Sequence, residues 1–192
     1  MDWKSRESFI SYLISEPKYF GNKSWQIKKT LLHIKHKHTP HFACFRDKKS
    51  ENLYRGAKAF LYAARLAKIE KVFLNGDYRL AKRLGFNGVH LPSKKLQMIK
   101  RAKRAGLIVI ASTHNIEEIA LAQRLGADFV TFSPIFYSPG KGEPKGIGNL
   151  RKIVKSVQVP VIALGGIISQ RQIHKVRMKG ARGFASIRYF VQ

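Results

Sequence analysis

The sequence has few acidic residues and a single cysteine. Of its 192 residues, 11 are Asp or Glu and 37 are Lys or Arg, which gives a formal net charge of +26. With Cys44 alone, an internal disulfide framework is excluded and a reducing, cytoplasmic location is predicted. No apolar run approaches the ~18 residues of a membrane-spanning helix. Asp2, Arg6 and Glu7 interrupt the N-terminal segment that would be apolar in a signal peptide, so no membrane partner is predicted.

The excess of basic residues favours anionic partners. These could be nucleic acids or anionic membranes, or phosphorylated small molecules bound by a protein with a generally basic surface. Lys and Arg are spread along the whole chain, with no zinc-finger spacing, no recognition-helix signature and no alternation of basic and aromatic residues on neighbouring strands. We therefore expect phosphorylated small-molecule substrates and no specific binding of nucleic acid.

Apolar strands alternate with amphipathic helical segments along the chain. The expected strands are Ile10–Ile14, His41–Phe45, Val72–Leu74, Gly88–Leu91, Leu107–Ala111, Phe129–Ser133, Val159–Leu164 and Gly183–Ile187. The expected helices are Trp25–Lys35, Leu53–Lys68, Arg79–Leu84, Leu96–Ala105, Ile116–Leu125, Gly148–Ser156 and Ser169–Lys179. Glycines at 85, 106, 126 and 180 stand where helices should stop.

Eight strands joined by helices predict the α/β class and, within it, a compact (β/α)8 TIM barrel. An open doubly wound sheet is the alternative. Only the residues from Tyr189 to Gln192 follow the last strand, so the final helix should be short or missing. No linker or low-complexity segment interrupts the pattern, and 44% of the residues are hydrophobic, so residues 1–192 are predicted to form one domain.

Residues suited to binding anions follow nearly every expected strand, and such barrels place their active sites at these C-terminal strand ends. In chain order these residues are Arg46, Lys48, Asn75, His90, Ser112, Ser138, Lys141, Gly165, Gly166 and Arg188. Taken singly, a loop cation is usually solvated, a Gly-Gly pair can be a tight turn, and His90 could be a core residue. Their recurrence at one end of the barrel favours a phosphate site.

The motifs at these positions are F-R-x-K, L-N-x-D-x-x-L-A, G-V-H-L, S-T-H, G-A-D-F-V-T-F-S-P-I-F and P-V-I-A-L-G-G-I. In this order, over roughly residues 40 to 188, the chain resembles the thiamine phosphate synthases and their TenI-type relatives. The resemblance implies an enzyme of thiamine biosynthesis. Such an enzyme would condense an aminopyrimidine pyrophosphate with a thiazole phosphate and release pyrophosphate, and a homo-oligomer is compatible with it.

The resemblance also implies roles for the strand-end residues. Pyrophosphate would be held by Arg46, Lys48, Asn75, Ser112 and Lys141, with Ser138 in the adjoining loop, and the thiazole phosphate by Gly165, Gly166 and Arg188. Within this set Lys48, Lys141 and Ser112 are the catalytic candidates, and His90 is assigned to substrate binding.

The sequence departs from the family pattern where Mg²⁺ is held. The acidic residue expected after Asn75 is Gly76, and the segment after the fourth strand is Pro92-Ser93-Lys94-Lys95, with no acid. We therefore predict no metal ligand and no certain cofactor, and Mg²⁺ stays possible without its usual acidic ligands. Lys94 or Lys95 could supply the charge that Mg²⁺ normally provides.

The TenI branch includes thiazole tautomerases that use a histidine at the end of the sixth strand. This chain has Pro134 there, and proline cannot transfer a proton. Two alternatives to a synthase stay open. One is a TenI-like barrel that binds thiazole phosphate or thiamine phosphate without turnover. The other is a basic protein that binds nucleic acid.

Overall fold

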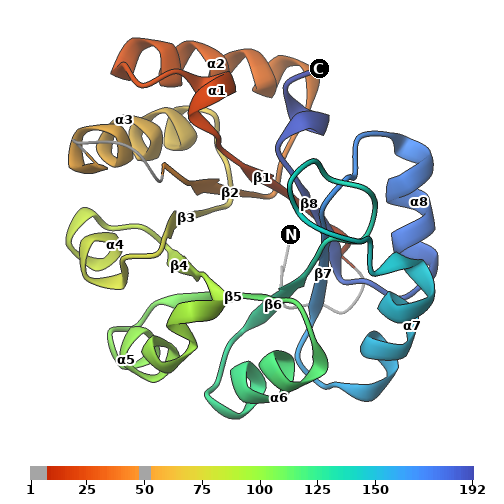
Figure 1. The fold of residues 1–192 in the computed structure, drawn as a ribbon. Helices are drawn as coiled ribbons and strands as arrows, with labels where there is room; N and C mark the ends of the chain where they lie inside the picture. The colour runs from red at the N-terminus through yellow and green to blue at the C-terminus, as the bar shows by residue number, and fades with distance from the viewer. Residues whose placement is uncertain (1–7, 48–52) are drawn as a thin grey trace.

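Eight parallel strands close into a barrel in the computed structural model, which describes residues 8–47 and 53–192 (Figure 1). The strands are β1 (Ile10–Ile14), β2 (Phe42–Phe45), β3 (Lys71–Asn75), β4 (Gly88–Leu91), β5 (Ile108–Thr113), β6 (Phe129–Phe132), β7 (Val161–Leu164) and β8 (Gly183–Ser186). Each strand pairs with the next in the chain, and β8 closes the barrel on β1 with Tyr12 opposite Ala185. The predicted TIM barrel is confirmed.

Side chains alternate between two cores, as the two-residue period of a strand requires. Along β1, Tyr12 and Ile14 belong to a cluster inside the barrel, while Leu13 belongs to the larger layer between the strands and the helices. The inner cluster contains Ile10, Tyr12, Ile14, Phe42, Cys44, Phe73, Ile110, Phe129, Ile162 and Ala185. The barrel is thus filled with packed side chains and is not a pore.

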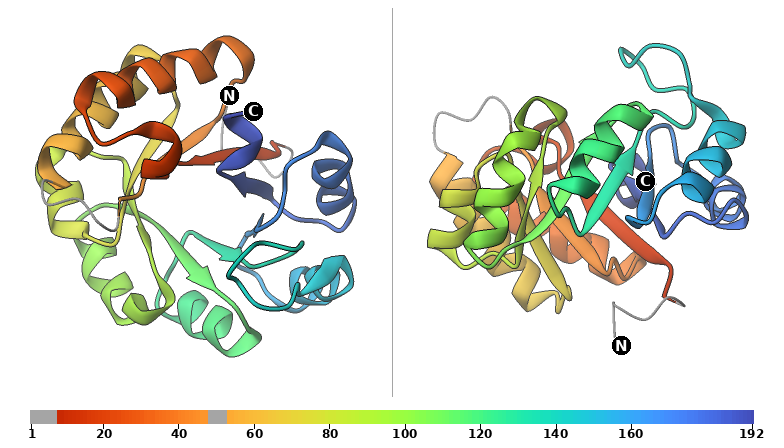
Figure 2. Two further views of the ribbon diagram at one scale, coloured as in Figure 1. Left: turned by 45° about the horizontal axis from the view of Figure 1, so that its top comes forward. Right: turned by 90° about the horizontal axis from the view of Figure 1, so that it is seen from below.

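Helices surround the barrel (Figures 1 and 2). They are α1 (Pro17–Phe20), α2 (Ser24–Lys37), α3 (Leu53–Leu66), α4 (Tyr78–Leu84), α5 (Ile99–Arg104), α6 (Ile116–Arg124), α7 (Gly146–Ser156) and α8 (Gln170–Met178), with the 3₁₀ helices η1 (Ser93–Met98) and η2 (Arg188–Phe190). Side chains cap several of them: the Asp77 carboxylate accepts the Leu80 N–H at 2.9 Å, and the Asn115 side chain accepts the Glu118 N–H at 2.8 Å.

The last strand is followed only by the three-residue helix η2, which confirms the expected short or missing final helix. Most element bounds shift by one or two residues from the sequence prediction, and three differences have a local cause. Helix α1 was missed because a helix of four residues is too short to show the 3.6-residue repeat of apolar side chains. The helix expected over Leu96–Ala105 is divided into η1 and α5, and Lys95 within η1 adopts φ −122° and ψ 22°, outside the helical region. Strand β7 begins after Pro160, which lacks the N–H needed for strand pairing.

The loop between β6 and α7 projects from one end of the barrel (Figure 2, right). It begins at Ser133, directly after β6, so this is the end at which the strands finish. Within residues 8–47 and 53–192, no helix is both long and apolar enough to cross a membrane.

Candidate active site

Three of the predicted residues, from β3, β4 and β5, are joined by hydrogen bonds at the strand ends. The His90 carbonyl oxygen accepts the Asn75 side-chain amide at 3.1 Å and the Gly76 N–H at 2.9 Å. The His90 ring lies 2.9 Å from Ser112, measured from Nε2 to Oγ. The His90 backbone thus positions the Asn75 side chain, and the His90 ring positions the Ser112 hydroxyl.

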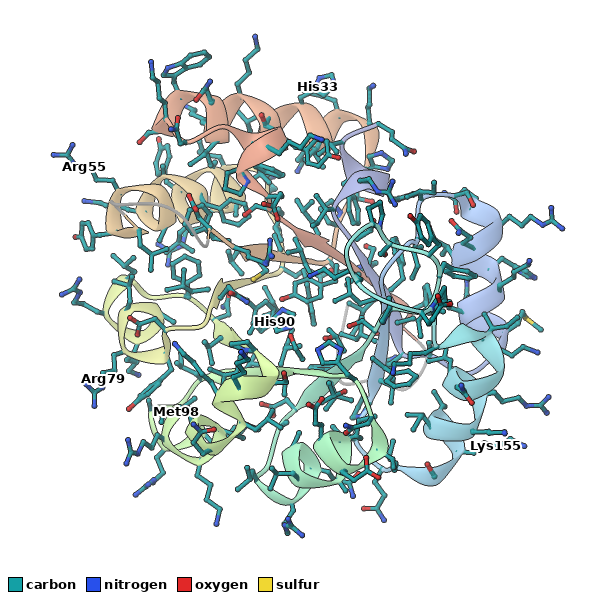
Figure 3. All side chains as sticks on the ribbon, in the orientation of Figure 1. His33, Arg55, Arg79, His90, Met98 and Lys155 are labelled. Atoms are coloured by element: carbon teal, nitrogen blue, oxygen red, sulfur yellow. The ribbon has the colours of Figure 1, made fainter. Side chains whose placement is uncertain are left out.

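His90 lies in the middle of the barrel and is almost fully buried (Figure 3). Its Nδ1 atom is 2.9 Å from the hydroxyl of Tyr12, so both ring nitrogens have partners. Burial, with a smaller contribution from the charge of Arg46, lowers the pKa of His90 to about 3. At neutral pH the imidazole is therefore uncharged, and it orients Ser112 instead of donating a proton to a substrate.

Cys44 lies on β2 beside this network and is completely buried. Burial raises the pKa of its thiol to about 12, and this outweighs the lowering by the Tyr12 hydrogen bond and the Arg46 charge. At neutral pH the Cys44 side chain is therefore a protonated, inert thiol.

Arg46 follows β2 and is bound to the end of β1. Its guanidinium forms an ion pair with Glu16, and its backbone N–H donates to the Ser15 hydroxyl at 2.8 Å. Side-chain exposure is 20% for Arg46 and 34% for Glu16, so the pair lies at the rim and not in the core. Sequence reasoning missed Glu16 because an acidic residue 30 positions from its partner carries no local signal.

Lys95 reaches from η1 to the end of β3. Its ammonium donates to the Gly76 carbonyl oxygen at 3.0 Å, while its side chain stays exposed. A positive charge therefore lies directly beside Asn75 and Gly76. Lys94, the neighbour in sequence, is exposed, and among the described residues its side chain makes no hydrogen bond to this strand end.

Ser138 and Lys141 lie on the projecting β6–α7 loop, where the Lys141 N–H donates to the Ser138 carbonyl oxygen at 3.1 Å. The structure gives Lys141 no contact with Asn75 or Ser112, and its side chain is exposed. Arg188 begins η2, after β8, and is half-buried. Lys48 lies outside the described residues.

Gly165 and Gly166 end β7 with φ of 98° and 68°, in the left-handed region that favours glycine. The base of the β6–α7 loop packs directly on them. A Cβ atom on Gly165 would lie 2.7 Å from Pro134 Cα, and one on Gly166 would lie 2.7 Å from the Phe136 carbonyl carbon. The pair therefore holds this loop against β7, whether or not it also binds a phosphate.

The strand ends thus combine a bound Arg, a Lys, an amide and a hydroxyl around a neutral histidine. At the strand ends of a (β/α)8 barrel, groups of this kind can bind the phosphate of a substrate. A family model described as thiamine monophosphate synthase matches residues 12–190. The chain belongs to the thiamine monophosphate synthase family.

Related proteins carry the same family name. The chain is 32% identical over 151 residues to "Putative thiamine-phosphate synthase 2" of Aquifex aeolicus, which covers 77% of this chain and 80% of that protein. It is 34% identical over 135 residues to a thiamine-phosphate synthase of Herpetosiphon aurantiacus, which covers 68% of this chain and 64% of the other.

The solved structure of a thiamine phosphate pyrophosphorylase from Pyrococcus furiosus superposes with a TM-score of 0.77 at 25% identity. That comparison covers 95% of this chain and 87% of the other. An N-acetylmannosamine-6-phosphate 2-epimerase from Clostridium perfringens has a TM-score of 0.74 at 13% identity, which shows the shared fold alone.

Proposed function

We propose that this protein condenses an aminopyrimidine pyrophosphate with a thiazole phosphate and releases pyrophosphate. The observation that carries the proposal is the hydrogen-bonded group of Asn75, His90 and Ser112 at the ends of β3, β4 and β5. The His90 carbonyl oxygen orients the Asn75 amide, and the His90 ring orients the Ser112 hydroxyl. Arg46 and Lys95 add positive charge at the same strand ends. Family membership supplies the two substrates.

The chemistry of this reaction suits a neutral His90. The bond between the pyrimidine methylene carbon and the pyrophosphate oxygen breaks, and its electron pair leaves with pyrophosphate. The thiazole nitrogen then donates its lone pair to that carbon. No proton has to be exchanged with the protein, so catalysis rests on positioning and on stabilising the charge of the leaving group.

A turnover assay with both substrates tests this proposal. We expect Ser112→Ala and Lys141→Ala each to lower kcat/KM by about 10- to 100-fold, because each removes a donor to pyrophosphate. Lys155→Ala is the matched control, since Lys155 is an exposed cation on α7 that points away from the barrel (Figure 3).

The absence of product from the wild-type protein would contradict the proposal. If thiazole phosphate then still raised the melting temperature, the TenI-like binding protein would be the correct function.

A separate observation favours a second function, on the outer surface of α2 and α3. A groove of about 450 Å³ is lined there by Ser24, Trp25, Lys28, Arg55, Lys58, Ala59 and Tyr62, which we call the α2–α3 face. Trp25 is 61% exposed and Tyr62 is 58% exposed. The Lys28 ammonium lies 5.6 Å from the centre of the Tyr62 ring.

Neither α2 nor α3 contains an acidic residue. Exposed aromatic rings between cations suit single-stranded nucleic acid, because bases stack on the rings and phosphates pair with the cations. A second copy of this chain would place like charges opposite each other, which is unfavourable. We therefore propose sequence-tolerant binding of single-stranded nucleic acid at the α2–α3 face. The rings and cations of this face lie on helices, so the sequence shows no alternation of basic and aromatic residues on neighbouring strands.

Titration of a fluorescent single-stranded RNA tests this second function. Trp25→Ala and Tyr62→Ala should each weaken binding by about 10-fold, as expected for loss of one stacking ring. Tyr137→Ala, which removes an exposed ring from the β6–α7 loop, should leave affinity unchanged. Equal effects of all three variants, or a dimer that only Trp25→Ala and Tyr62→Ala dissociate, would refute it.

A further inference from the structure

The ends of β3 and β4 do not fit the Mg²⁺ ion that the family resemblance implies. The position after Asn75 is Gly76, and the segment Pro92–Lys95 supplies lysines in place of an acid. The neighbouring Asp77 carboxylate accepts the Leu80 N–H at 2.9 Å as the cap of α4. In the described part of the chain, no three His, Cys, Asp or Glu side chains are grouped so that they could hold a metal.

A lysine ammonium lies at this strand end. Lys95 Nζ is 3.0 Å from the Gly76 carbonyl oxygen and 3.9 Å from the point where a Cβ atom on residue 76 would lie. A side chain at position 76 would thus begin within contact distance of the ammonium. The acid that the resemblance places after Asn75 is missing at Gly76, and the Lys95 ammonium lies beside that position. A cation of the chain thus lies where the resemblance places a carboxylate.

Backbone geometry directs Lys95 to this place. Its φ of −122° and ψ of 22° interrupt η1, and its N–H is fixed by the Pro92 carbonyl oxygen at 2.8 Å. On the other side, the Gly76 N–H is held by the His90 carbonyl oxygen, the same atom that accepts the Asn75 amide. The ammonium therefore has a defined position next to Asn75, and its exposed side chain leaves donors available to a ligand.

Charge balance gives this ammonium a role. Departing pyrophosphate carries several negative charges, and Arg46 is already paired with Glu16, which offsets part of its charge. Within the described residues, the Lys95 ammonium donates to a backbone carbonyl oxygen and forms no ion pair with a carboxylate. A fixed cation beside the leaving oxygen stabilises the charge that develops as the C–O bond breaks, without an ion that must be recruited.

We infer that Lys95 replaces Mg²⁺ in this protein, as the catalytic cation for pyrophosphate in a metal-independent reaction. The inference rests on the proposed condensation. The electron pair of the breaking C–O bond goes to the pyrophosphate oxygen, and the Lys95 ammonium stabilises that oxygen electrostatically while keeping its protons. Lys94, next in sequence but not bonded to the Gly76 carbonyl, has no such role.

Turnover and pyrophosphate binding, each measured in EDTA and in Mg²⁺, test the inference. The wild-type kcat should agree within about 3-fold between the two conditions, and calorimetry should show pyrophosphate binding in EDTA. Lys95→Ala should lower kcat by about 100-fold, the usual cost of removing one such charge-stabilising donor. It should also weaken pyrophosphate binding by at least about 10-fold. Lys94→Ala is the matched control and should change both by less than about 3-fold, because it removes a cation without the Gly76 contact.

Turnover that strictly requires Mg²⁺, or equal effects of Lys95→Ala and Lys94→Ala, would overturn the inference while leaving the proposed function intact. If no variant turns over under any condition, the proposed function fails. The Lys95-dependent binding of pyrophosphate in EDTA then still decides whether this lysine is the anion-binding cation.

Discussion

Acidification from pH 7 to pH 3 is expected to remove about 4 kcal/mol of folding stability through His90 alone. A histidine in the unfolded chain takes up its proton near pH 6.5, whereas burial lowers the pKa of His90 to about 3 in the folded protein. Between these values the unfolded state binds the extra proton. Stability from this group is therefore complete above about pH 6.5 and is lost as pH falls toward 3.

Urea unfolding at several pH values measures this effect in wild type and in His90→Gln. Glutamine keeps one donor and one acceptor for Tyr12 and Ser112 but does not titrate. The folding stability of His90→Gln should therefore fall by about 4 kcal/mol less than that of wild type between pH 7 and pH 3. The exposed His33 on α2 provides the control, and His33→Gln should follow the wild-type curve (Figure 3). Parallel curves for wild type and His90→Gln would contradict the buried, neutral imidazole.

Gly166→Ala should destabilise the protein by about 3 kcal/mol and release the base of the β6–α7 loop. The residue has φ 68°, and the added methyl group would press on the Phe136 and Tyr137 backbone. Moving that backbone would break the hydrogen bond from the Phe136 N–H to the Gly165 carbonyl oxygen, now 3.0 Å long. Left-handed strain costs about 1–2 kcal/mol and overpacking about 1–3 kcal/mol, which together give the expected loss.

Gly142→Ala separates these two contributions within the same loop. Gly142 has φ 70°, but nothing lies within 4 Å of the position of its Cβ atom. Its substitution should therefore cost only the strain, about 1 kcal/mol. Chemical unfolding gives both values, and limited proteolysis reports whether the loop is released. Equal losses in the two variants would show that the loop is not held through Gly166.

The barrel could be predicted because its strands are buried on both faces and are separated by helices with glycine at their ends. Strands β1 and β4 have the predicted bounds. Errors arose where a local period is absent. Helix α1 is a single turn that begins at Pro17, and η1 is interrupted at Lys95, whose backbone angles no side-chain pattern encodes.

The site was predictable in its strand-end positions but not in its contacts. Asn75 and Ser112 were found because they end parallel strands, which must finish at one end of the barrel. The pairing of Arg46 with Glu16 depends on β1 and β2 being neighbours, and the bond between Lys95 and Gly76 depends on the path of η1. The binding and catalytic roles of all the predicted site residues stay predictions, and Lys48 lies outside the described residues.

The ion pair between Arg46 and Glu16 makes ligand binding at this arginine an exchange reaction. An incoming pyrophosphate has to share or displace the Glu16 carboxylate that is already paired with the guanidinium. The net free energy of binding at Arg46 is therefore the difference between its interaction with pyrophosphate and its interaction with Glu16. The same carboxylate competes for Arg46 after the reaction, when free pyrophosphate must depart. In the proposed reaction, Glu16 would thereby lower the affinity of Arg46 for substrate and product alike and shorten the time that the product stays bound.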